Sequence, residues 1–220
     1  MNDIKLESQS WTLDFVSLTP FKVFESCLFL FVGLRQLSFT NITQFIYRLI
    51  KCPELCFGIF ISATPTSEVA EAETWTTARC VENGSERRLV LVAHAIGTKT
   101  VNDTIKDEDM DLPDDIHHST VPEVANRYPD SPRKGHKEDG RTLCLHSLAV
   151  LPRYQHKGVG RTLLRSYIQT MHEQQVADRL AIITYRDLVE LYEKFGFKTL
   201  GESKAKFGGG NWIDMVYDIR

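Results

Sequence analysis

The stretch that decides the fold runs from Arg141 to Leu164 and reads RTLCLHSLAVLPRYQHKGVGRTLL. Its first part, Thr142 to Leu151, is apolar and rich in branched residues, which is typical of a buried strand. Pro152 ends that strand, and a short basic turn leads to Gly158-Val159-Gly160. Apolar residues then recur at helical spacing, so a helix is predicted to begin near Gly160. A glycine turn at a helix N-terminus exposes backbone N–H groups and a favourable dipole, which suit an anion such as a pyrophosphate.

Length and composition favour one globular domain with a long insert, because 220 residues with 42% hydrophobic and 25% charged residues are ordinary values. The net charge of -3 argues against nucleic acid as a partner, since nucleic-acid binding leaves a basic footprint. Five irregularly spaced cysteines fit reduced cytosolic thiols better than a disulfide framework. Cys52 and Cys56 lack a second ligand pair at zinc-like spacing, so we predict no metal site.

The N-terminus carries Asp3, Lys5 and Glu7 where a signal peptide would need basic and then apolar residues. The apolar run from Ser26 to Leu34 is far shorter than the ~20 residues that cross a bilayer. We therefore expect a cytoplasmic monomer with no membrane or nucleic-acid partner.

The N-terminal part divides into an unusual segment and a regular one. Residues 1–44 are predicted to supply the first strand, at 11–18, and part of the first helix; residues 45–220 form the main domain. Residues 21–44 lack an amphipathic pattern, and both a buried helix and translation of an unspliced intron are compatible with them. From Asn41 apolar residues follow one helical face until Pro53 stops the helix. Strands are predicted at 55–63 and 88–100, paired antiparallel.

The segment 102–141 is predicted to be a long loop inserted into the domain. It is acidic in its first half and contains four prolines, which discourage regular structure. Such a charge run is usually solvated; the alternatives are a lid or an electrostatic lure for a cationic substrate.

The C-terminal part is predicted to contain a strand at 179–185, a helix at 188–195 closed by Gly196, and a hairpin formed by 197–202 and 212–219. The expected fold class is α/β (α+β), with a mixed, mostly antiparallel sheet flanked by helices in a single domain.

Two motifs resemble the GCN5-related N-acetyltransferases (GNAT). Residues 155–160 (QHKGVG) match the Q/R-x-x-G-x-G/A motif, and residues 191–197 (LYEKFGF) are similar to the LYEKxGF ending. Within that superfamily the chain is most similar to the arylalkylamine (serotonin-type) N-acetyltransferases, through CPEL at 52–55, LHSLAV at 145–150 and the helix at 187–197. The resemblance covers residues 42–220 apart from the acidic loop, and it implies the GNAT fold.

The resemblance also implies acetyl-CoA as the donor and a primary amine as the acceptor, joined by direct attack in a ternary complex. It places the pyrophosphate on a turn composed of Gln155, His156, Lys157, Gly158, Val159, Gly160 and Arg161. It places the pantetheine along Leu148, Ala149 and Val150, with the Leu148 N–H as donor to the thioester carbonyl. It implies Tyr192 as the general acid for the coenzyme A thiolate, and Pro53, Leu55 and Ile183 as the lining of an aromatic-amine pocket that Phe207 and Trp212 could help to shape.

The amine must lose a proton before it attacks, because an alkylamine with a pKa near ~10 is neutral in only about one molecule in a thousand at pH 7. Histidine is the side chain best suited to accept that proton. The resembling enzymes carry histidines at both positions that correspond to Cys144 and His146, so His146 is the one matched base here. Strand alternation predicts one face with Cys144, His146 and Leu148 and another with Leu143, Leu145 and Ser147. The other histidines, at 94, 117, 118, 136 and 172, are expected to be solvated or structural.

Three other functions stay open. A polyamine N-acetyltransferase would account for the acidic loop, a protein N-terminal acetyltransferase has no feature in its favour, and a non-catalytic coenzyme A-binding module would fit the cysteine at position 144.

Overall fold

The computed structural model describes residues 13–17, 39–63, 79–80, 88–113 and 133–220. Most of the segment 21–44, to which the intron hypothesis applies, lies outside the described residues, as do residues 114–132 of the predicted loop with His117 and His118.

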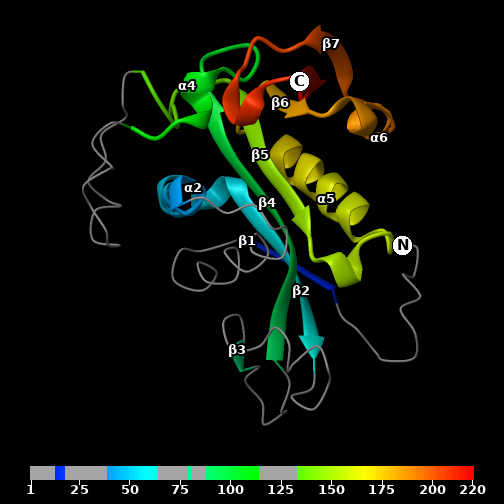
Figure 1. The fold of residues 1–220 in the computed structure, drawn as a ribbon. Coiled ribbons are helices and arrows are strands. Elements are labelled where there is room, and N and C mark those ends of the chain that lie inside the picture. Colours follow the sequence, from blue (N-terminus) through cyan, green and yellow to red (C-terminus); the bar gives the residue numbers. More distant parts are fainter. Residues whose placement is uncertain (1–12, 18–38, 64–78, 81–87, 114–132) are drawn as a thin grey trace.

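The described strands form one eight-stranded sheet in the order β1-β2-β4-β5-β6-β8-β7, with β3 paired to β4 (Figure 1). The strands are β1 Leu13–Ser17, β2 Cys56–Ala63, β3 Arg79–Cys80, β4 Arg88–Thr100, β5 Thr142–Val150, β6 Arg179–Thr184, β7 Lys198–Glu202 and β8 Ile213–Asp218. β5 and β6 are parallel and the other described pairs are antiparallel. The predicted fold class is therefore confirmed, as are the pairing of β2 with β4 and the hairpin of β7 and β8.

Helices cover both faces of this sheet. The α-helices are α2 Phe39–Lys51, α4 Asp107–Met110, α5 Val159–Gln174 and α6 Val189–Glu193, and the 3₁₀ turns are Pro53–Leu55, Pro152–Tyr154, Arg186–Leu188 and Phe207–Gly209. The three helices predicted from the sequence agree with α2, α5 and α6. α4 falls within the predicted loop, because a single helical turn leaves no periodic pattern to detect. Gly196 follows α6 with a φ of 92°, in agreement with its predicted capping role.

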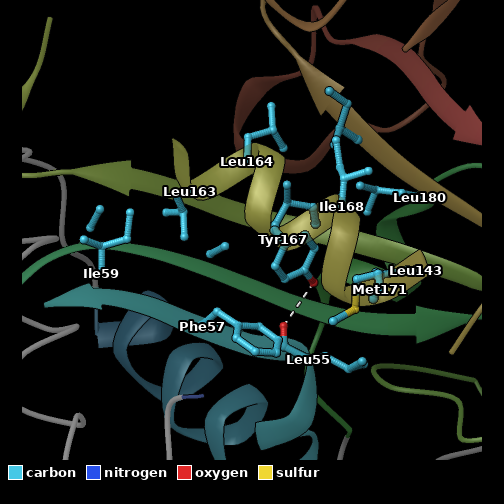
Figure 2. Close-up of a cluster of buried hydrophobic side chains, with 14 of the residues drawn as sticks. Leu55, Phe57, Ile59, Leu143, Leu163, Leu164, Tyr167, Ile168, Met171 and Leu180 are labelled. Carbon is cyan, nitrogen blue, oxygen red and sulfur yellow. Dashed lines mark hydrogen bonds between the residues drawn. The ribbon is translucent and has the colours of Figure 1, made fainter. Parts of the chain in front are cut away.

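The main hydrophobic core lies between α5 and the sheet (Figure 2). α5 contributes its buried stripe to this core: Val159, Leu163, Leu164, Tyr167, Ile168 and Met171. A smaller cluster lies on the opposite face, where Phe45 and Leu49 of α2 cover Cys56, Phe60, Leu91 and Ile96. The two faces of the sheet are thus distinct: one faces α5, and the other faces α2 and α4.

A glycine and a tyrosine fit together at the centre of the α5 face. The Tyr167 hydroxyl is fully buried and donates a hydrogen bond of 3.0 Å to the Leu55 carbonyl (Figure 2). A Cβ atom at Gly97 would overlap with that hydroxyl oxygen and would lie 3.3 Å from the Cys144 carbonyl oxygen. Only a residue without a side chain therefore lets β4 pass beneath the hydroxyl.

We predict that the cost of Gly97→Ala depends on the Tyr167 hydroxyl. Tyr167→Phe should lower the free energy of unfolding by about 1–3 kcal/mol, since it leaves a buried carbonyl unpaired. Gly97→Ala should cost about 1–3 kcal/mol through the overlap. The double variant should lose at least about 1 kcal/mol less than the sum, because the overlapping atom is gone. Urea unfolding of the four proteins checks this, and simple additivity would contradict it.

A buried histidine lies on the α2 face. The His94 side chain has 0% exposure, its Nε2 is 2.8 Å from the Ser147 hydroxyl, and its ring meets Phe45 edge to face with centroids 5.7 Å apart. Burial lowers the pKa of His94 to about 3. The prediction of a structural role for this histidine agrees with that environment.

Because its folded-state pKa lies below the unfolded value near ~6.5, His94 binds a proton in the unfolded chain before it does so in the folded one. The fold should lose stability as the pH falls through that window, and His94 alone should account for about 2 kcal/mol at pH 5. Urea unfolding from about pH 7 to about pH 5 should show a shallower pH dependence in His94→Asn than in the natural chain. His172→Gln, on the exposed side of α5, is the control and should keep the natural slope.

Candidate functional site

The parallel strands β5 and β6 separate soon after they pair. Their register contains three rungs, at Thr142–Arg179, Leu143–Leu180 and Cys144–Ala181. β5 nevertheless continues to Val150, and β6 continues to Thr184 with β8 as its partner. Residues 145–150 therefore pair with β4 on one edge and leave the edge toward β6 open to another extended group.

The open edge leads directly into the glycine turn. The Pro152–Tyr154 turn follows β5, and Gly158 adopts a φ of 84° immediately before α5. The first bond within the helix runs from the Thr162 N–H to the Gly158 carbonyl at 3.0 Å, so the N–H groups of residues 159–161 point out of the helix end. The turn lies close to the end of β5, since a Cβ at Gly160 would lie 3.3 Å from Cγ2 of Val150. The Gln155 side chain donates to the Val150 carbonyl at 3.0 Å.

His146 is the extra residue of a β-bulge. Ser147 pairs with Ile96 and Leu145 pairs with Gly97, so the residue between them in β5 has no partner in β4. A bulge places two successive side chains on the same face of the sheet. The predicted alternation is therefore wrong beyond this point.

The contacts on the two faces show the change. His146 contacts Thr98 and Ser147 contacts His94, so both side chains lie with Cys144 on the face toward α2 and α4. Leu148 packs instead with the α5 cluster, as Leu143 and Leu145 do.

The His146 imidazole is half-buried and has a protein contact at each ring nitrogen. Nε2 is 2.7 Å from the Thr98 hydroxyl and Nδ1 is 3.1 Å from the Met110 sulfur. Burial lowers the pKa of His146 well below its usual range, and the charges of Arg48 and His136 lower it further. The imidazole is thus neutral at pH 7, the state in which a histidine accepts a proton.

In the described part of the acidic segment, residues 102–113, four carboxylates contact neighbouring residues. Asp107 accepts hydrogen bonds of 2.8 Å from the backbone N–H groups of Lys206 and Phe207, and Asp109 accepts one of 2.8 Å from Lys106. Asp103 and Asp111 form ion pairs of 3.6 Å with Arg179 and Lys134. The described half of the loop therefore packs α4 onto the domain, and these four carboxylates have contacts within the chain.

Tyr192 lies on α6 at the edge of the main core. Its ring meets Phe197 edge to face with centroids 5.5 Å apart, and burial raises the pKa of the hydroxyl. The hydroxyl therefore keeps its proton at neutral pH and can serve as a donor.

The three residues proposed for an amine pocket are not brought together. Leu55 is fully buried in the α5 core and Pro53 begins the preceding 3₁₀ turn. Ile183 lies on the other face, in a cluster that includes Met110, Cys144 and Phe207. The Oδ1 atom of Asp214, opposite Ile183 in β8, is buried without a hydrogen-bond partner in the described part of the chain.

Sequence reasoning missed Thr98, Met110, Gln44 and Arg48. Thr98 could have been found, because it lies opposite Cys144 once β4 and β5 are paired. Met110 gave no signal, since it reaches His146 from a segment with no strand or helix pattern. Among the described residues no cluster of histidine, cysteine or acidic side chains could hold a metal ion, and no helix is long and apolar enough to cross a bilayer.

Comparisons with known proteins bear on the fold and on the family of the C-terminal part. Residues 135–219 match the family model described as the acetyltransferase (GNAT) domain. The serotonin N-acetyltransferase of Mesocricetus auratus is 32% identical over 85 residues, which are 39% of this chain and 41% of that protein. The match thus spans about two-fifths of the length of that relative.

Two solved structures share the fold at low sequence identity. The loading GNATL domain of CurA from Lyngbya majuscula has a TM-score of 0.55 and 14% identity, with 96% of this chain and 98% of that chain covered. A chain of the NatC complex bound to Gag peptide and CoA has a TM-score of 0.56 and 13% identity, with 94% and 98% covered. The described strands and helices therefore have the GNAT fold, and residues 135–219 match the acetyltransferase (GNAT) family model.

Proposed function

We propose that the protein is an acetyl-CoA-dependent N-acetyltransferase that acts on a primary amine of the arylalkylamine type. The observation that carries this proposal is the separation of β5 from β6 directly before the glycine turn of α5. An extended chain of amide groups can pair with the open edge of residues 145–150, as another strand would. A pyrophosphate can then accept hydrogen bonds from the turn.

The residues of the turn suit the donor substrate. Gly158 has no protein atom within 4 Å of the position of a Cβ, so the backbone is open to close approach by a ligand. Lys157 and Arg161 are exposed beside it and carry charge opposite to that of a phosphate. We assign the phosphates to residues 155–161 and the pantetheine to Leu148, Ala149 and Val150, with the Leu148 N–H polarising the thioester carbonyl.

We predict that Gly158→Ala weakens coenzyme A binding about 10-fold, because an alanine at a φ of 84° is strained and moves the N–H groups of the turn. Gly201→Ala is the matched control. Gly201 also has a positive φ, of 113°, and open space around it, but it lies in β7. Titration calorimetry with coenzyme A checks both variants, and equal losses of affinity would argue against the assignment of the turn.

Proton transfer is assigned to His146 and Tyr192. The neutral imidazole of His146 takes a proton from the ammonium group, directly or through the Thr98 hydroxyl or water, and the amine then attacks the thioester carbon. Tyr192 keeps its proton because burial raises the pKa of its hydroxyl, and it donates that proton to the departing thiolate. The nitrogen of the adduct gives its second proton to the tyrosinate, directly or through water, so that the amide forms and Tyr192 is restored. No acetyl-enzyme forms in this sequence of steps.

The acceptor is proposed to enter on the face that carries His146. Ile183, Phe207 and Met110 form an apolar cluster there, and the Tyr185 and Trp212 rings stack with centroids 4.3 Å apart at the adjoining strand ends. Aromatic and apolar groups suit an aryl ring better than a polyamine. Asp107 and Asp109 are engaged with backbone N–H groups, whereas Asp103 and Asp111 are exposed, so the carboxylates do not decide against a polyamine and the apolar cluster carries the choice. Pro53 and Leu55 are left out of this acceptor site, because Leu55 is buried in the α5 core on the other face.

We predict that His146→Gln and Tyr192→Phe each lower kcat by ~10-fold or more, the range of acid–base losses. Tyr217→Phe is the control for the second variant. Tyr217 also packs on Phe197, at a centroid distance of 5.7 Å, but it lies on β8 rather than α6. His172→Gln is the control for the first. Natural turnover in both test variants would remove the proposed acid and base while leaving the donor assignment intact.

The overall proposal is tested by release of free thiol from acetyl-CoA in the presence of tryptamine, phenylethylamine, spermidine and a short peptide. Turnover with the two aryl amines is the expected result. A preference for spermidine or for the peptide would show that the acceptor is a polyamine or a protein N-terminus rather than an arylalkylamine. Retained coenzyme A binding without turnover of any acceptor would identify a non-catalytic module.

A further inference from the structure

Two elements contact the His146 imidazole directly, and a third holds one of these contacts in place. Thr98 of β4 contacts Nε2 at 2.7 Å, and Met110 of α4 contacts Nδ1 through its sulfur at 3.1 Å. Met110 is itself held by α2, because its carbonyl accepts hydrogen bonds from Gln44 at 2.9 Å and from Arg48 at 3.1 Å. We infer that Met110 is a positioning residue that fixes the tautomer and orientation of His146, and that Gln44 and Arg48 hold Met110 in place for this role. The inference deepens the proposed function and rests on it for its catalytic consequence.

The tautomer follows from the chemistry of the two contacts. A thioether sulfur carries no proton and can only accept a hydrogen bond, so the contact with Met110 requires the proton on Nδ1. In the neutral ring Nε2 then carries the lone pair, which accepts the hydrogen bond from the Thr98 hydroxyl. The nitrogen that can take a proton from the acceptor is therefore Nε2, on the side of Thr98.

The anchoring of Met110 is firm on both sides of α4. Gln44 and Arg48 are 4% and 5% exposed, so their bonds to the Met110 carbonyl are sheltered from water. At the other end of α4, Asp107 accepts the backbone N–H groups of Lys206 and Phe207. The Met110 side chain is 6% exposed and belongs to a packed cluster with Ile105, Cys144, Ala181 and Val216, which restricts its movement away from the imidazole.

Arg48 has a second effect on the imidazole, through its charge. Among the described residues, the charges of Arg48 from α2 and His136 from the segment before β5 act on His146, and Asp109 from α4 and Arg48 act on its neighbour Cys144. Burial lowers the pKa of Arg48 to about 10, so the guanidinium is still charged at pH 7. Burial raises the pKa of Cys144 well above its usual value, so that thiol is neutral at pH 7, and burial also raises the pKa of Asp109. A positive charge near His146 opposes formation of the imidazolium and so keeps the ring available as a base.

The test uses two buried methionines on opposite faces of the sheet. Met110→Leu removes the sulfur from His146 and nearly keeps the volume, and Met171→Leu makes the same change in the α5 core. Histidine ring nitrogens are observed by ¹H–¹⁵N NMR in the full chain, with His146→Gln used to assign the signals. The natural chain and Met171→Leu should show the proton on Nδ1 of His146, whereas Met110→Leu should show a mixture of both tautomers.

Kinetics adds a readout that a merely structural role would not produce. Met110→Leu should lower kcat by about 10-fold with an unchanged KM for acetyl-CoA, while Met171→Leu keeps both values. Arg48→Met should raise the pKa of His146 by about one unit, seen both in the NMR titration and as a shift of the acid limb of kcat to higher pH.

The inference is overturned if Met110→Leu keeps the Nδ1–H tautomer, or if Met171→Leu changes it equally. It is also overturned if a changed tautomer in Met110→Leu leaves kcat unaltered in an active enzyme. The NMR experiment needs no turnover. If the protein acetylates no amine, the proposed function is refuted, but the NMR spectra still show which nitrogen of His146 carries the proton.

Discussion

The β-bulge at His146 is the constraint on which the rest of the site depends. It follows the last rung between β5 and β6, at Cys144 and Ala181, by two residues. Bulges bend a strand and increase its twist, which accounts for β5 leaving β6 at this point. The bulge thus accounts for the open strand edge, and it turns Leu148 and Val150 to the α5 face while His146 stays on the α2 face with Cys144.

The bulge also places the residues proposed to bind the donor and the proposed base on different faces of the sheet. Leu148 and Val150 return to the α5 side, where they join the core beside the turn that is proposed to hold the phosphates. His146 and Ser147 face α2, where the groups around them are polar and buried: Thr98, His94 and Arg48. Gly97 allows this arrangement because it pairs with Leu145 beside the bulge and leaves room for the Tyr167 hydroxyl.

The described half of the acidic loop has a structural role. α4 is fastened to the Phe207 turn by Asp107 and to α2 through the Met110 carbonyl, so it covers the α2 face of β5. Of the described carboxylates that suggested a lure for cations, Asp107 and Asp109 accept backbone hydrogen bonds, and Asp103 and Asp111 form ion pairs at the surface. What the loop brings to His146 is a sulfur atom, in a chain where Cys144 stands at the position of a second histidine in the resembling enzymes.

The sequence by itself determined most of the helices and strands and their positions along the chain. Strand and helix periods, Pro53, the glycines of the α5 turn and Gly196 are local signals, and local signals depend only on neighbours along the chain. They were enough to predict the sheet class, the β2–β4 pair, the final hairpin and the turn before α5. Placing His146, Tyr192 and residues 155–161 in roles came from resemblance rather than from pattern.

Only the tertiary structure decided which groups surround His146. The bonds from Gln44 and Arg48 to Met110 join residues 66 and 62 positions apart, and Met110 reaches His146 across 36 positions. The bulge depends likewise on the register of β5 against β4, and an error of one residue reverses every side chain beyond it. Pairings over such distances leave no period in the sequence, because they are set by how the sheet and its helices pack together.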